Sequence, residues 1–198
     1  MILLVAIVAG LTATVLRSKL TGRQLQPIKF EFIWLVFIAV LPQIILFEIP
    51  AVGRQVPDMW VSTILVFSQA TLLGFAGANI ALPGVWLLMI GLAANYLAIV
   101  SNGGWMPINP VTVHRILPSL PNDYPLVGRR LGLSKDWVLA SGDINFSRLA
   151  DRFTTPDWIP YRVAFSIGDV LIAIGAILLL WSMSSPKIWR RYDTANTN

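Results

Sequence analysis

The stretch Trp60–Ile80, WVSTILVFSQATLLGFAGANI, contains no charged residue. After a short turn at Pro83, a second uncharged stretch, GVWLLMIGLAANYLAIVS, occupies Gly84–Ser101. An α-helix needs about 20 mainly apolar residues to cross the hydrocarbon core of a bilayer, where every backbone polar group must be satisfied within the segment. These two stretches therefore predict a pair of membrane-spanning helices joined by a tight turn.

Three further apolar stretches carry at most one charge each: Met1–Leu16, Phe32–Ile49 and Val163–Met183. Together with the first two, they predict an all-α, polytopic membrane helix bundle with about five transmembrane helices, forming a single membrane domain over residues 1–198. The spans fall at about 1–16, 32–49, 60–80, 84–101 and 163–183. Residues 102–162, between the fourth and fifth spans, are called the lid here and are expected to lie on the bundle outside the membrane.

The composition supports a membrane protein and leaves little room for familiar catalytic chemistry. Hydrophobic residues make up 56% of the chain and charged residues only 13%, whereas a soluble domain is about a quarter charged. The chain has no cysteine and one histidine, His114, which excludes disulfides, thiolate catalysis and Cys- or His-rich metal sites. We therefore expect a non-enzymatic protein with no catalytic residue, no cofactor and no bound metal.

Basic residues at the ends of the apolar stretches predict the orientation. The loop after the first stretch carries Arg17, Lys19, Arg23 and Lys29, which places it in the cytoplasm by the positive-inside rule. Counting onward, the N-terminus and the lid lie outside, and the C-terminus, with Lys187, Arg190 and Arg191, lies in the cytoplasm. The net charge of +5 thus reflects topology, and no nucleic-acid partner is expected.

Polar side chains on three of the predicted spans share one depth below the outer surface. Asp169 is the only ionisable residue deep inside a span, six residues from the outer end of its stretch, and Gln43 and Asn95 lie six residues from the outer ends of theirs. Asn102 follows on the helical face of Asn95, and Ser166 lies one turn before Asp169. An ionisable group inside a membrane is costly and marks a candidate site.

Two interpretations of this cluster remain open. In one, the cluster lines an outward-facing polar pocket for a small ligand, an ion or a proton. In the other, it is a hydrogen-bonded network that holds helices together, with Asp169 neutral or paired with Arg54 or Arg162. The structural interpretation is favoured, because polar contacts between membrane helices are common. The lid carboxylates, which alternate with arginines, are expected to form solvated ion pairs: Asp123, Asp136, Asp143, Asp151 and Asp157.

Small residues at four-residue spacing predict where helices pack closely, since lipid supplies no hydrophobic drive for their association. Such stripes begin at Ala6 and Gly10 on the first stretch and at Ala164 and Gly168 on the fifth, and the longest, on the third stretch, consists of Ala70, Gly74 and Ala78. Packing within the bundle is the favoured interpretation, and a dimer interface is the alternative.

Turn and capping residues predict the local structure of the lid. Gly103 and Gly104 indicate a sharp end to the preceding helix. Asn109 followed by Pro110 is typical of a helix N-terminus, and predicts a short helix over Val111–Leu117. A second short helix is expected over Ser147–Phe153.

Two motifs resemble the signatures of an uncharacterised bacterial family of four-to-five-span membrane proteins. In that family a helix ends in Asn before Asn-Gly-Gly-x-Met-Pro, and a last helix opens with Ser-Ile-Gly-Asp-Val. The matching positions here are Asn95, Asn102, Gly103, Gly104, Met106, Pro107, Ser166, Gly168 and Asp169. The resemblance covers nearly the whole chain and implies a multi-pass protein of the bacterial cytoplasmic (inner) membrane, with no known activity. This sequence differs in having Trp105 where a basic residue is usual.

The leading functional hypothesis is a structural or accessory subunit of a larger membrane complex. Its expected partners are the lipid bilayer and other membrane protein subunits, or further copies of the same chain. The alternative is a small oligomeric transporter or channel that uses the polar site around Asp169.

Overall fold

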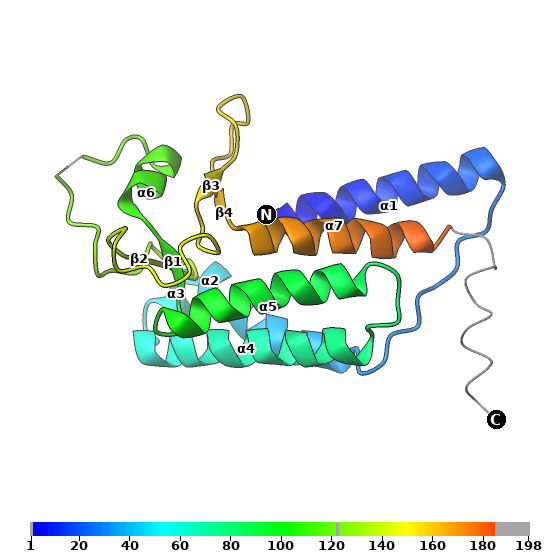
Figure 1. The fold of residues 1–198 in the computed structure, drawn as a ribbon, viewed down its shortest axis with the longest axis horizontal. Coiled ribbons are helices and arrows are strands. Elements are labelled where there is room, and N and C mark those ends of the chain that lie inside the picture. Colours follow the sequence, from blue (N-terminus) through cyan, green and yellow to red (C-terminus); the bar gives the residue numbers. More distant parts are fainter. Residues whose placement is uncertain (1, 122, 185–198) are drawn as a thin grey trace.

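The computed structural model describes residues 2–121 and 123–184, and in this part the chain is mostly helical (Figure 1). The basic residues at positions 187, 190 and 191, on which the predicted placement of the C-terminus partly depends, lie outside the described residues. The long helices are α1 (Ile2–Thr21), α2 (Trp34–Glu48), α4 (Asp58–Ala78), α5 (Val85–Ser101) and α7 (Ile167–Ser182), and the short ones are α3 (Pro50–Gly53) and α6 (Pro110–Ile116).

Each of the five predicted apolar stretches forms a helix, and at two places the boundary shifts by more than two residues. The first helix continues to Thr21, past the basic residues that were expected to end it, and the last begins at Ile167, four residues later than expected. The segments Leu3–Thr21 and Asp58–Ala78 are long and apolar enough to cross a membrane. The other three apolar helices, α2, α5 and α7, have 15, 17 and 16 residues.

The long helices lie alongside one another, and their main contacts give the neighbour order α1–α7–α5–α4–α2. The last helix, α7, therefore lies between the first helix and α5, while α4 lies between α5 and α2. The N-terminus, α3 and the lid are at one end of these helices, and the connection 22–33 and the turn between α4 and α5 are at the other (Figure 1).

Four glycines allow α5 and α7 to pack backbone against backbone. A Cβ atom added at Gly91 would lie 2.6 Å from the carbonyl oxygen of Gly168, and one added at Gly175 would lie 2.7 Å from the amide nitrogen of Leu88. Real Cβ contacts are essentially never this short, so larger residues cannot occupy these positions without moving a helix. Gly84 and Gly168 meet the facing helix in the same way. We call Gly84, Gly91, Gly168 and Gly175 the glycine seam.

The predicted small-residue stripes differ in whether they pack against another helix. Gly10 packs on α7, where an added Cβ would lie 3.3 Å from the Cα atom of Ile177. The pairing of Ala164 with Gly168 as a helical stripe is wrong, because Ala164 lies in a strand before α7 begins. The prediction that the α4 stripe packs inside the bundle is also wrong, since an added Cβ at Gly74 meets no atom within 4 Å.

The lid contains two small sheets and one short helix. Strand β1 (Met106–Ile108) pairs in parallel with β2 (Asp136–Val138), and β3 (Phe153–Thr154) pairs antiparallel with β4 (Ala164–Phe165). The predicted helix over Ser147–Phe153 is wrong. This segment forms turns that end in a bridge between Asp151 and Ile108, and Phe153 starts β3. Its backbone is thus used for pairing with β1 and β4.

The other predicted lid helix is confirmed. Helix α6 begins at Pro110, and the side chain of Asn109 accepts a hydrogen bond of 2.7 Å from the backbone N–H of Thr112. Asn109 thereby satisfies one of the donors that a helix N-terminus leaves without an intrahelical partner.

The lid is also held to the helices by an aromatic cluster. Trp105 is buried, and its ring lies 5.4 Å from that of Trp137. The guanidinium group of Arg130 lies 5.3 Å from the Trp105 ring and 5.4 Å from the ring of Phe47 on α2, within the range of cation–π attraction. The tryptophan that departs from the family motif therefore helps to fix the lid on the bundle.

Candidate functional site

The candidate site begins at the N-terminus of α7, where Ser166 and Asp169 cap the helix reciprocally. The Ser166 hydroxyl accepts a hydrogen bond of 3.1 Å from the Asp169 backbone N–H, and Asp169 Oδ2 accepts one of 3.1 Å from the Ser166 backbone N–H. This capping box satisfies two backbone donors of the first turn. The spacing Ser-x-x-Asp before an apolar stretch is a sequence signal that, if used, would have placed the start of α7 at Ile167.

Asn95 on α5 joins this capping box to the neighbouring helix. Its Nδ2 atom donates a 2.8 Å hydrogen bond to Asp169 Oδ1, and its Oδ1 atom accepts one of 2.9 Å from the Ser166 hydroxyl. Asn95 and Ser166 are buried. The side-chain amide fits only because residue 168 is glycine, since an added Cβ there would collide with Asn95 Oδ1. The side chains of Asn95, Ser166 and Asp169 thus form most of their hydrogen bonds within this network.

The lid contributes Lys135 to this site, next to Asp169. The sequence analysis did not single out this lysine. Lys135 Nζ lies 2.8 Å from Asp151 Oδ2, 3.9 Å from Asp136 Oδ1 and 4.0 Å from Asp169 Oδ2. The predicted pairing of Asp169 with Arg54 or Arg162 is therefore wrong: its ionic partner is Lys135, and Arg162 lies 3.6 Å from Asp157. We call Lys135, Asp136, Asp151 and Asp169 the Lys135 cluster.

Two of its carboxylates are buried, which corrects the expectation that they form solvated pairs. The side chain of Asp151 is 1% exposed and that of Asp136 is 12% exposed. Asp136 Oδ2 accepts a hydrogen bond of 3.0 Å from the Ser134 hydroxyl. Within the described part of the chain, Asp136 Oδ1 and Asp151 Oδ1 are buried without a hydrogen-bond partner.

The electrostatics of the cluster reflect one ammonium group facing three carboxylates. Burial lowers the pKa of Lys135, but the nearby charges of Asp151, Asp169 and Asp136 outweigh it, and the pKa is raised above its usual value. Burial raises the pKa of Asp151 well above its usual range; Lys135 opposes this rise, and Asp136 and Asp169 add to it. Lys135 therefore keeps its charge, while Asp151 resists ionisation.

The structure does not bring the other predicted polar residues to this site. Gln43 is on α2, and α4 and α5 lie between α2 and α7 in the neighbour order. Asn102 belongs to a second contact between α5 and the lid. Its Nδ2 atom donates to the carbonyl oxygens of Ala98 and Asn145, and its Oδ1 atom accepts from the Asn145 backbone N–H.

The motif residues that follow Asn102 shape the exit from α5. Gly103 and Gly104 have φ angles of +74° and +87°, and the Gly104 N–H donates a 2.9 Å hydrogen bond to the carbonyl oxygen of Ile99. These left-handed conformations favour glycine and end the helix. Met106 and Pro107 enter β1, where both are buried, and the Pro107 carbonyl accepts a hydrogen bond from the Asp151 N–H.

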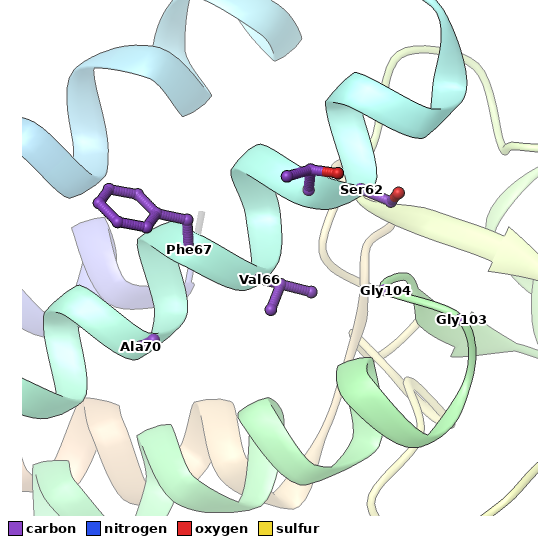
Figure 2. A pocket seen from close by; sticks show the side chains of 7 residues that line it. Ser62, Val66, Phe67, Ala70, Gly103 and Gly104 are labelled. Atoms are coloured by element: carbon purple, nitrogen blue, oxygen red, sulfur yellow. The ribbon is translucent and has the colours of Figure 1, made fainter.

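A separate surface feature lies on α4. A shallow groove of about 510 Å³ is bordered by residues of α4 and by the two glycines that follow α5: Ser62, Thr63, Val66, Phe67, Ala70, Gly103 and Gly104 (Figure 2). Further towards the C-terminal end of α4, Gly74 and Gly77 are exposed, and added Cβ atoms there meet nothing within 4 Å. We call Thr63, Phe67, Ala70, Gly74 and Gly77 the α4 face.

Comparison with known proteins places the chain in a family. No curated protein and no solved structure matches it. Residues 27–181 match a family of unknown function, DUF5317, and this range includes α2, α4, α5, the lid and all but the last residue of α7. The match confirms the predicted membership of an uncharacterised family: the chain belongs to the DUF5317 family of unknown function.

Proposed function

We propose that this chain is a non-enzymatic, structural subunit of the bacterial cytoplasmic membrane that assembles through its α4 face. In this proposal α1, α2, α4, α5 and α7 cross the bilayer, and the N-terminus and the lid lie on the outer side. The Lys135 cluster and the network around Asn95 hold the lid on the helix ends. The observation that carries the proposal is the exposed α4 face.

Membrane insertion is supported by the apolar surface of the helices. Large hydrophobic side chains are exposed on each of them, for example Leu4 on α1, Phe37 on α2, Phe67 on α4, Ile90 on α5 and Ile174 on α7. Soluble monomers rarely expose apolar patches of more than a few hundred Å². In a bilayer these side chains contact hydrocarbon instead of water, so their exposure is not unfavourable. The shorter helices span the core with local thinning of the bilayer or with snorkelling of flanking residues.

The orientation is supported by the distribution of basic residues. Arg17 and Lys19 lie in the last turns of α1, at the end away from the lid, and Arg23 and Lys29 lie in the connection that follows. Basic residues in short connections favour the cytoplasmic side, whereas long segments are translocated largely regardless of charge. The proposal therefore puts the connection 22–33 in the cytoplasm and the lid outside.

Single-cysteine variants test the orientation cleanly, because the natural chain has no cysteine. Gly142 in the lid and Gln24 in the first connection are both exposed. In spheroplasts, a membrane-impermeant maleimide should label Gly142→Cys directly and Gln24→Cys only after permeabilisation. Labelling of both variants in intact spheroplasts, or the reverse pattern, would contradict the proposed topology.

The α4 face is suited to close contact with another membrane helix. Membrane helices associate where small residues let their backbones approach, and the glycine seam shows this between α5 and α7. Ala70, Gly74 and Gly77 offer the same kind of surface on α4, yet it faces away from α2 and α5. Its occupant in our proposal is the α4 face of a second copy, since a two-fold axis brings identical patches together.

We expect the wild-type protein to be a dimer in mild detergent, and Gly74→Leu to weaken the dimer about tenfold or more, because the larger side chain separates the two backbones. Light scattering would measure the mass against the 21.9 kDa of one chain. Disulfide formation by Gly74→Cys under mild oxidation gives an independent readout.

The control is Val8→Leu, at an exposed position on α1, which should leave the dimer unchanged. A monomeric wild-type protein would overturn the proposal. A stable complex whose extra mass is not a multiple of one chain would show that a different subunit covers the α4 face.

A further inference from the structure

The Lys135 cluster has more negative than positive charge, and two of its carboxyl groups, those of Asp151 and Asp136, are largely removed from water. Three carboxylates lie within 4.0 Å of a single ammonium nitrogen, so one positive charge faces three negative ones if all are ionised. Charges that are removed from water are tolerated only when they are paired and hydrogen-bonded. Asp169 meets this requirement through Asn95 and its capping box. Asp151 and Asp136 do not meet it fully.

Both of these residues have an oxygen atom that lacks a donor. Asp151 Oδ1 and Asp136 Oδ1 are buried, and no described residue donates a hydrogen bond to either. The nearest cation, Lys135, donates to the other oxygen of Asp151 and lies 3.9 Å from Asp136 Oδ1. An added proton on Asp151 would reduce the excess negative charge and would leave a neutral carboxyl group, which is less costly to bury without full hydrogen bonding than a carboxylate.

We propose that the Lys135 cluster binds a proton at Asp151, and that this proton helps to hold the lid against α7. The inference is independent of dimer formation, since all four residues belong to one chain. The charged groups that act on Asp151 are Lys135, Asp136 and Asp169. Strand β1, whose residue Ile108 bridges to Asp151, contributes no titratable side chain.

The sign of the pH dependence follows from the burial of Asp151. Its pKa is raised in the folded protein, so the folded state binds more protons than the unfolded state between the ordinary and the raised pKa. The resulting stabilisation is fully present below the ordinary pKa and is lost as pH rises through the raised one. Deprotonation at alkaline pH leaves three ionised carboxylates around Lys135 and weakens the contact between the lid and α7.

Infrared spectroscopy of the full-length protein in lipid nanodiscs tests the proposal directly. At neutral pH we expect the carbonyl stretching band of a protonated carboxyl group, which disappears as pH is raised. Asp151→Asn should abolish this band. Asp136→Asn should retain it with a titration midpoint lowered by about one pH unit or more, because a neighbouring negative charge has been removed. The control Asp157→Asn, at a 94% exposed side chain, should leave the band unchanged.

The proposal is overturned if no such band exists at neutral pH, or if the band survives in Asp151→Asn. If that variant does not fold, the Asp136→Asn midpoint decides, and an unchanged midpoint rejects the proposal. A band that Asp157→Asn alters would assign the proton to the exposed surface and would also reject it. Amide hydrogen exchange adds a structural readout: exchange at the Asp151 N–H should rise with pH beyond its intrinsic base catalysis in the wild type, but not in Asp151→Asn.

Discussion

Gly168→Leu should abolish the packing of α5 against α7 and give one of the largest losses of stability of any substitution in this chain. Position 168 faces both Asn95 Oδ1 and the carbonyl oxygen of Gly91, which an added Cβ would approach to 2.8 Å. The larger side chain therefore pushes the helices apart and removes Asn95 from Asp169. Overpacking of this kind costs about 3 kcal/mol, before the lost hydrogen bonds are counted. Thermal or denaturant unfolding in nanodiscs measures the change.

The control for this experiment is Gly142→Leu, at a lid position where an added Cβ meets no atom within 4 Å, and it should unfold like the wild type. Gly168→Ala should fall between the two, because a single methyl group already meets both partners. If Gly168→Leu were as stable as the Gly142 variant, the close contact between α5 and α7 would be wrong.

Lys135→Met should detach the lid from the helix ends. The substitution keeps an unbranched side chain of similar length but leaves three carboxyl groups, two of them buried, without the ammonium group that they share. Removal of one partner from a buried ion pair costs about 3–5 kcal/mol, and we expect about 3 kcal/mol here because the Lys135 side chain is 32% exposed and partly screened. Hydrogen exchange in β1 and β2 and limited proteolysis of the lid would report the loss.

Two comparisons separate this effect from a general loss of positive charge. Arg129→Met, at an exposed position of the lid, should leave lid exchange unchanged. The double variant Lys135→Met, Asp136→Asn should recover part of the stability, because it removes one of the negative charges that Lys135 no longer balances. The single variant should also be less impaired at low pH, where the carboxylates are protonated. An equal loss in all variants and at every pH would contradict the ionic account.

The helices could be predicted from the sequence because each is a long apolar stretch bounded by polar or turn residues. The Trp60–Ile80 prediction differs from α4 by only two residues at each end. The start of α7 was set too early because Val163, Ala164 and Phe165 are apolar like a helix face, although they form and flank β4. Hydrophobicity alone does not distinguish a short strand from the start of a helix, whereas the capping residues Ser166 and Asp169 do.

The candidate site was predicted only in part, because depth along a helix does not specify which helices are neighbours. Asn95 and Asp169 meet since α5 and α7 are in contact. Gln43 was expected at the same depth, but two helices intervene between its helix and α7. Which helices contact one another depends on packing surfaces such as the glycine seam, whose members are spread over both helices and cannot be paired by sequence spacing alone.

The lid was the least predictable part, because its contacts join residues that are distant in sequence. Lys135 and Asp169 belong to different elements, and Asp151 was expected on a short helix that does not exist. The segment has no helical or alternating periodicity that would reveal the short strands β1 and β2. The helix N-cap at Asn109 could be predicted from the sequence, because a cap depends on residues only three positions apart.

The neighbour order has a consequence for how the protein is made. Helix α1 contacts α7, and α2 and α4 pack together at the other side of the row. If the proposed topology holds, α1 enters the bilayer during synthesis without its eventual neighbour α7, which leaves the ribosome only after the lid has been synthesised. In that topology α1 contacts lipid until α7 is inserted, whereas α2, α4 and α5 can associate as they are made. The proposed topology therefore makes final assembly of the bundle a late event in biogenesis, because it depends on translocation of the lid.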